Sequence, residues 1–286
     1  MGRLTLRAAF AWQDVEFVQI NDPAGNAETL AHLLKYDSVH GIWPHEVDHD
    51  GNNVIVNGHV IRVTENKTIS ETDWSECDLV IEASGKMKTT QLLQAYLDQG
   101  VKKVVVTAPV KEDGVLNVVM GVNDHLYDVD QHSIVTAASC TTNCLAPMAK
   151  VLNDTFGIEK GYITTVHAYT ADQRLQDAPH KDLRRARAAA LSMVPTSTGA
   201  AKAVGEFSAA TNGLSSDNFG ETIPQFHNLS FRFTEFLTAL TNGNPKRIAE
   251  QNQLIIEIKN LSYICKTYEE IKANPDIPLR IQHHDT

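Results

Sequence analysis

Cys140 is the residue of this 286-residue chain that is best placed to act as a nucleophile. It stands in the segment 139–144, Ser-Cys-Thr-Thr-Asn-Cys, between an apolar run that predicts a buried strand and a pattern that predicts a helix. A cysteine at a helix N-terminus is stabilised as a thiolate by the helix dipole and by unpaired backbone N–H groups, which also suit an oxyanion. The alternative for Cys140 alone is a buried structural thiol.

A nucleophilic cysteine needs a base or an ion-pair partner, and His167 is the leading candidate. It lies in the segment 164–169, Thr-Thr-Val-His-Ala-Tyr, where a predicted strand would otherwise favour apolar residues. The alternative is a core histidine whose hydrogen bonds are satisfied. Cys144 lies one helical turn after Cys140, but two sulfurs without a matching His or Cys cluster make a weak metal site. We therefore assign Cys144 to packing and predict no metal.

Asp22 is the candidate for binding a dinucleotide cofactor. It follows the apolar run 15–20, at the place where dinucleotide-binding folds put an acid that binds the ribose hydroxyls and repels a 2′-phosphate, so it predicts NAD over NADP. The alternative is an ordinary turn residue before Pro23. No glycine-rich phosphate loop precedes it, because the chain passes from Met1 and Gly2 directly into a predicted helix. From this we expect weakened NAD binding.

The elements that must position these residues form an α/β pattern. Short apolar runs at 15–20, 79–81, 104–107 and 134–137 alternate with helical patterns and predict a parallel sheet. A crossover helix is predicted over 91–99, ended by Gly100, and a β-hairpin over 54–63, with Asn57-Gly58 as its turn. A second domain is expected to begin near Cys140 with a strand at 162–169, and an apolar face with spacings of three and four predicts a helix over 245–273.

Composition narrows the class of protein. The formal net charge of −10 argues against a nucleic-acid partner, and no apolar stretch is long enough to span a membrane. No signal peptide is evident at the N-terminus, and four cysteines in a chain of this length do not make a disulfide scaffold. These features lead us to expect a soluble, cytoplasmic protein with free thiols.

Taken together, several segments resemble phosphorylating glyceraldehyde-3-phosphate dehydrogenases. The segments that carry the resemblance are 20–23 (Ile-Asn-Asp-Pro), 82–85 (Glu-Ala-Ser-Gly), 107–109 (Thr-Ala-Pro), 138–144, 165–170, 179–187 and 195–205. The resemblance runs from Gly2 to about Gly205 and implies an incomplete Rossmann-type NAD-binding domain at 1–139, a partial α+β catalytic domain at 140–205 and an unassigned, partly helical tail at 206–286.

The resemblance also implies a reaction. Cys140 adds to the aldehyde of glyceraldehyde 3-phosphate, His167 takes the hydroxyl proton, hydride passes to NAD, and inorganic phosphate cleaves the thioester to give 1,3-bisphosphoglycerate. By the same resemblance, the substrate and phosphate groups are held by Ser139, Thr141, Thr170, Arg185, Thr198 and Gly199. The residues implied to bind the cofactor are Gly2, Asp22, Lys67, Ser84 and Thr107. A homotetramer is expected for the family.

The chain also departs from the family pattern. The family's first strand and first two glycines have no counterpart ahead of Gly2, and its antiparallel catalytic strands are not found after Gly205. Two other classes therefore stay open: a non-catalytic remnant that acts as an interaction module, and a Cys–His hydrolase that needs no nicotinamide. Arsenate as acceptor and erythrose 4-phosphate as substrate also stay open.

Overall fold

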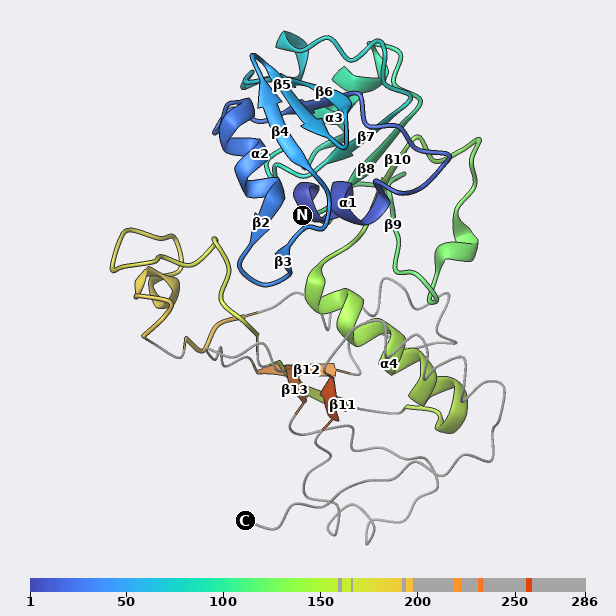
Figure 1. Ribbon diagram of the computed structural model, residues 1–286. Helices are drawn as coiled ribbons and strands as arrows, with labels where there is room; N and C mark the ends of the chain where they lie inside the picture. The colour runs from blue at the N-terminus through green and yellow to red at the C-terminus, as the bar shows by residue number, and fades with distance from the viewer. Residues whose placement is uncertain are drawn as a thin grey trace, which may run out of the picture. The chain divides into compact units, whose positions relative to one another are not determined.

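The computed structural model describes residues 1–158, 161–165, 167–191 and 194–197, together with three short strands further along the chain. It divides into two compact units (Figure 1). The first unit comprises residues 1–118 and 126–139, and the second comprises 119–125 and the chain from 140 onward. None of the helices in the described part of the chain is long and apolar enough to cross a membrane.

The first unit opens with helix α1 (Gly2–Ala9) and a four-stranded sheet in the order β1-β6-β5-β4. Its strands are β1 (Gln19–Asn21), β4 (Val47–Asp50), β5 (Asn53–Val56) and β6 (His59–Thr64). β1 pairs with β6 in parallel, whereas β4, β5 and β6 are antiparallel. The predicted hairpin is confirmed: Asn57 and Gly58 have φ values of 49° and 81°, the left-handed conformation that a two-residue turn requires.

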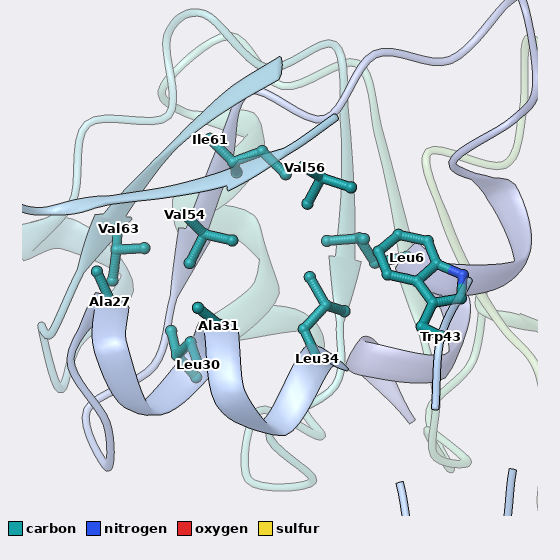
Figure 2. Close-up of a cluster of buried hydrophobic side chains, with 10 residues drawn as sticks. All are labelled: Leu6, Ala27, Leu30, Ala31, Leu34, Trp43, Val54, Val56, Ile61 and Val63. Carbon is teal, nitrogen blue, oxygen red and sulfur yellow. The ribbon is translucent and has the colours of Figure 1, made fainter. Parts of the chain in front are cut away.

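Helix α2 (Ala27–Lys35) covers this sheet and forms the first hydrophobic core with it. Asn26 caps the helix by accepting a hydrogen bond from the Thr29 N–H at 3.0 Å. Figure 2 shows the apolar side chains of α2 facing those of β5 and β6, with Leu6 from α1 and Trp43 at one end. The buried members are Leu6, Ala27, Leu30, Ala31, Leu34, Trp43, Val54, Val56, Ile61 and Val63.

The second sheet of this unit is entirely parallel, in the order β7-β8-β10-β9. It consists of β7 (Leu79–Glu82), β8 (Lys103–Val106), β9 (Leu116–Asn117) and β10 (Ile134–Thr136), and α3 (Thr90–Leu97) crosses between β7 and β8. Leu93 and Tyr96 of α3 are buried in a second core with Val80, Val104 and Val106. The predicted α/β class and crossover helix are confirmed, and so is the parallel sheet for the runs at 79–81, 104–107 and 134–137. The run at 15–20 was wrongly placed in this sheet: it forms β1, which pairs with β6 in the other, mixed sheet.

Strand β1 is shorter than the predicted 15–20. It begins only at Gln19, and the carbonyl of Phe17, inside the predicted range, lies 2.8 Å from the ring Nε2 of His59. The remaining short elements of this part of the chain are β2 (Tyr36–Asp37), β3 (Gly41–Ile42), and the 3₁₀ turns η1 (Ile69–Glu71) and η2 (Asp124–Leu126).

The second unit contains the long helix α4 (Cys140–Phe156), strand β11 (Gly161–Thr164) and the 3₁₀ turn η3 (Leu183–Ala186). β11 pairs in parallel with β12 (Phe219–Thr222), and β13 (Phe231–Phe233) pairs antiparallel with β14 (Ile256–Ile258). β14 corrects the helix predicted over 245–273, since the β-branched Ile256 and Ile258 form a strand there. The rest of that predicted helix lies outside the described residues.

Candidate active site

Cys140 is the first residue of helix α4 and its side chain is exposed. Its Sγ lies 3.2 Å from Nε2 of His167 and 4.0 Å from the hydroxyl of Thr141. The strand after α4 thus returns the histidine to the start of the helix, 27 positions along the chain. A thiol, a ring nitrogen and the N-terminal amides of a helix are the parts that an activated cysteine requires.

The protonation of His167 follows from its second ring nitrogen. Nδ1 lies 2.5 Å from the backbone carbonyl oxygen of Ala168, and because a carbonyl oxygen only accepts, Nδ1 carries a proton. Nε2 is therefore the nitrogen that exchanges a proton with Cys140. His167 was predicted inside a strand, but β11 ends at Thr164, so the ring stands beyond the regular strand.

The electrostatics of the two side chains favour a thiolate–imidazolium pair. The hydrogen bond from His167 lowers the pKa of the Cys140 thiol below its usual value, although desolvation of the thiol by the groups around it opposes this shift. The same hydrogen bond raises the pKa of His167, against partial burial and the positive charge of Arg185, which both lower it. Both shifts therefore move the pair toward the state in which the sulfur is negative and the ring is positive.

Cys144 behaves differently from Cys140, one turn further along the same helix. Only 5% of its surface is exposed, and this burial raises the pKa of its thiol to about 11. A buried neutral thiol matches the packing role predicted for it. Among the residues that the structure describes, no three His, Cys, Asp or Glu side chains gather as metal ligands would.

Thr170 is the best-defined of the predicted phosphate-binding residues. It lies on the surface, in a turn that Gln173 closes in both directions: the Gln173 N–H donates to the Thr170 carbonyl at 3.0 Å, and the Thr170 N–H donates to Gln173 Oε1 at 3.1 Å. Thr141 is buried beside the sulfur of Cys140. Ser139 is the residue directly before Cys140 in the chain. Thr198 and Gly199 lie outside the described residues.

Arg185 reaches the same region as His167 but is held by other groups. Its guanidinium forms an ion pair with Asp172, and it also donates to the Thr196 hydroxyl at 3.0 Å and to the Ser197 carbonyl at 3.2 Å. Partial burial would raise the pKa of Asp172, but Arg185 holds it below its usual value. Sequence reasoning missed Asp172, because nothing in the spacing of these residues indicates that the loop brings them together.

Three of the predicted cofactor residues gather at one edge of the parallel sheet of the first unit. The Thr107 N–H, after β8, donates to the carbonyl of Glu82 at the end of β7 at 2.9 Å, and Ser84 follows two residues later. Gly2 lies close to Ala83, between Glu82 and Ser84: a methyl group at position 2 would be only 3.2 Å from the Ala83 Cβ. Ligands of open α/β sheets bind at this carboxyl edge of the strands.

Asp22 and Lys67 lie at the end of the other sheet of this unit. The Asp22 N–H donates to the Thr64 carbonyl at 2.9 Å, directly after the paired ends of β1 and β6. Lys67 is exposed and follows Asn66, which hydrogen-bonds to Asn21. An acid at the end of a parallel strand and a glycine that lets a helix approach a sheet are features that a dinucleotide site needs, so these residues fit NAD.

Comparison with protein families assigns both parts of the chain. Residues 1–90 match the NAD-binding domain of glyceraldehyde 3-phosphate dehydrogenase, and residues 139–216 match its C-terminal domain, together more than half of the chain. The chain belongs to the glyceraldehyde-3-phosphate dehydrogenase family. The predicted resemblance is confirmed, and the C-terminal match extends past residue 205, where the resemblance ended in the sequence alone.

Bacterial members of the family are similar to this chain. It is 53% identical over 206 residues to glyceraldehyde-3-phosphate dehydrogenase 3 of Nostoc sp. and 52% identical over 206 residues to the enzyme of Geobacillus stearothermophilus. These alignments cover 71% of this chain and 61% of each relative. The enzyme of Mycolicibacterium smegmatis is 53% identical over 196 residues, covering 67% of this chain and 57% of the relative. The chain thus spans about three fifths of the length of these relatives.

Proposed function

We propose that the chain oxidises glyceraldehyde 3-phosphate with NAD and inorganic phosphate to 1,3-bisphosphoglycerate, with Cys140 as nucleophile. The observation that carries the proposal is the 3.2 Å contact between Cys140 Sγ and His167 Nε2 at the N-terminus of α4. It supports covalent chemistry at sulfur, and the family supplies the substrate class.

The residues of the chain account for each proton. The Cys140 thiolate attacks the aldehyde carbon, and the carbonyl oxygen takes the proton from Nε2 of His167 to give a hydroxyl. The same nitrogen removes that proton again as the carbon is oxidised. NAD, when bound, accepts the hydrogen and two electrons that leave the carbon. The resulting thioester is attacked at its carbonyl by phosphate, the carbon–sulfur bond breaks, and the thiolate returns to its pair with His167.

The proposed binding groups follow the chemistry of their side chains. Hydroxyls and amides of Ser139, Thr141, Thr170, Thr198 and Gly199 suit phosphate oxygens, and Arg185 adds a positive charge. For the cofactor, we assign Gly2, Asp22, Lys67, Ser84 and Thr107, with the Asp22 carboxylate favouring NAD over NADP. The catalytic part of the chain is assigned to residues 140–205, to which the family match adds 206–216, and residues 217–286 receive no role. We also expect a homotetramer in the cytoplasm, as the family resemblance implies, and sedimentation velocity tests the tetramer.

The test is NADH formation by the purified chain given glyceraldehyde 3-phosphate, NAD and phosphate. Cys140→Ser is expected to abolish turnover, because a neutral hydroxyl replaces the thiolate. Cys144→Ser is the matched control: it changes a buried thiol on the same helix and should retain activity. Omitting phosphate should stop turnover after one equivalent of NADH per site. An inactive wild-type chain, or a Cys140→Ser variant with full activity, would contradict the proposal.

A further inference from the structure

The side-chain amide of Asn21 joins three segments of the first unit. Its Oδ1 accepts hydrogen bonds from the Thr64 hydroxyl at 2.8 Å, the Asn66 N–H at 3.0 Å and the Thr72 hydroxyl at 3.2 Å. Its Nδ2 donates to the Asn66 carbonyl at 3.0 Å. One amide therefore ties the end of β1 to the end of β6 and to the segment after η1.

These bonds surround the residue before Asp22. The Asp22 N–H donates to the Thr64 carbonyl, and its own Oδ1 accepts the Ala24 N–H at 2.9 Å. The backbone on both sides of the carboxylate is thus fixed, and one carboxylate oxygen is already engaged, which leaves a defined direction for the other. If the amide of Asn21 were removed, Thr64 and Thr72 would lose their common acceptor, and the end of β1 would keep only its backbone pairing.

We propose that Asn21 is a positioning residue that aims the Asp22 carboxylate at the adenosine ribose and so sets the preference for NAD over NADP. The inference rests on the proposed function, because it assumes that the chain binds NAD. Asn21 does not touch the cofactor in this role; it acts through Asp22. A binding group that is held by hydrogen-bonded neighbours loses affinity and selectivity when those neighbours are removed.

The experiment is calorimetric titration of the full chain with NAD and, separately, with NADP. The variants are Asn21→Ala, Asp22→Ala and the double variant, and the matched control is Asn57→Gly. Asn57 also has its side-chain amide in hydrogen bonds, to the Glu46 N–H and the His45 ring, but it lies in the turn at the opposite end of β6. Glycine there keeps the left-handed turn and removes only the amide.

Asn21→Ala is expected to weaken NAD binding about tenfold, on the order expected for a displaced hydrogen-bonding group, and to leave NADP binding nearly unchanged, so that the preference narrows. In the Asp22→Ala background the same change should have little further effect, since the two residues act as a unit. Asn57→Gly should leave both affinities as in the wild type.

Two results would overturn this inference and leave the proposed function standing. The first is an Asn21→Ala variant that binds NAD as tightly as the wild type. The second is a loss of NAD affinity on Asn21→Ala that is equally large in the wild type and in Asp22→Ala, which would indicate a general structural role. A wild-type chain that binds no NAD would overturn this inference together with the proposed cofactor. Thermal unfolding of each variant shows that the comparison is made between folded chains.

Discussion

The guanidinium of Arg185 is held in an ion pair with Asp172 while its charge acts on the ring of His167. The ion pair reduces the electrostatic repulsion between Arg185 and a protonated His167, because the carboxylate of Asp172 compensates the charge of the guanidinium. The loop that carries Arg185 therefore takes part in the balance between thiol and thiolate at Cys140, although neither residue contacts the sulfur in the bonds described above.

Asp172→Asn should lower the pKa of His167, because it leaves the charge of Arg185 without its partner. Arg185→Met should raise it, because the opposing charge is gone. Titration of the His167 ring by NMR measures both shifts, and their opposite sign is the test. Equal shifts in one direction would mean that the two substitutions act by distorting the loop instead.

Alkylation of Cys140 by iodoacetamide should depend on pH in a way that reports the lowered pKa of its thiol. A lowered pKa leaves more thiolate below the usual range of a thiol, so the rate near pH 6 should exceed that of an ordinary cysteine, and it should fall as pH drops through the lowered value. His167→Asn removes the hydrogen bond that is the main cause of the lowered pKa. We expect the alkylation rate to fall roughly tenfold near pH 6 and to equal that of the wild type at high pH.

Cys144→Ser is the control for that measurement. The thiol of Cys144 is buried and its pKa is raised to about 11, so Cys144 should contribute almost nothing to alkylation near neutral pH, and the variant should react like the wild type. A profile that is the same in the wild type and in His167→Asn would show that the contact between ring and sulfur does not govern reactivity.

Tyr96→Phe should destabilise the first unit, because Glu82 is only 5% exposed and its Oε2 accepts the Tyr96 hydroxyl at 2.7 Å. Loss of a hydrogen-bond partner to a buried carboxyl group costs about 1–3 kcal/mol, measured as a drop in the free energy of unfolding in urea. Tyr127→Phe removes a hydroxyl from a ring that is 42% exposed and should change stability by less than about 0.5 kcal/mol. Similar effects of the two substitutions would rule out a special contribution from the buried pair.

Two adjacent leucines of α3 test the second core. Leu93 is fully buried, whereas Leu92 is 46% exposed. Leu93→Ala should lower the free energy of unfolding by about 2–5 kcal/mol through lost burial and the cavity left behind. Leu92→Ala should cost less than about 1 kcal/mol, and urea denaturation of both variants would show whether the face assigned to the sheet is the correct one.

The sequence predicted the parallel sheet well because its strands are continuous apolar runs. β7, β8 and β10 lie within one residue of the predicted ranges, and the left-handed Asn57-Gly58 turn was found because few other residue pairs adopt that conformation. β9 was missed: two residues carry no periodicity, and Leu116–Asn117 becomes a strand only by pairing with β10. The helix predicted through 256–258 was wrong because the spacing of three and four did not outweigh the β-branched residues.

The candidate site could also be predicted only in part. The position of Cys140 at a helix start could be predicted, since an apolar run ends and a helical pattern begins there. The tautomer of His167 could not, because it depends on the carbonyl of Ala168, and neither could the pairing of Arg185 with Asp172 across a loop. Asn21 stood beside a recognised acid, but its contacts come from residues 43 to 51 positions away.

The register of the first sheet also fixes an order of assembly. β5 and β6 are joined by two residues and can pair within about 1–10 μs, the time of a simple hairpin. β1 must find β6 across a separation of 43 residues, with α2 and the strands β2 to β5 between them in the chain, and it contributes only three paired residues. We therefore expect β1 to dock last and detach first, which makes the strand that carries Asp22 the place where occupancy by a nucleotide would slow the opening of the sheet.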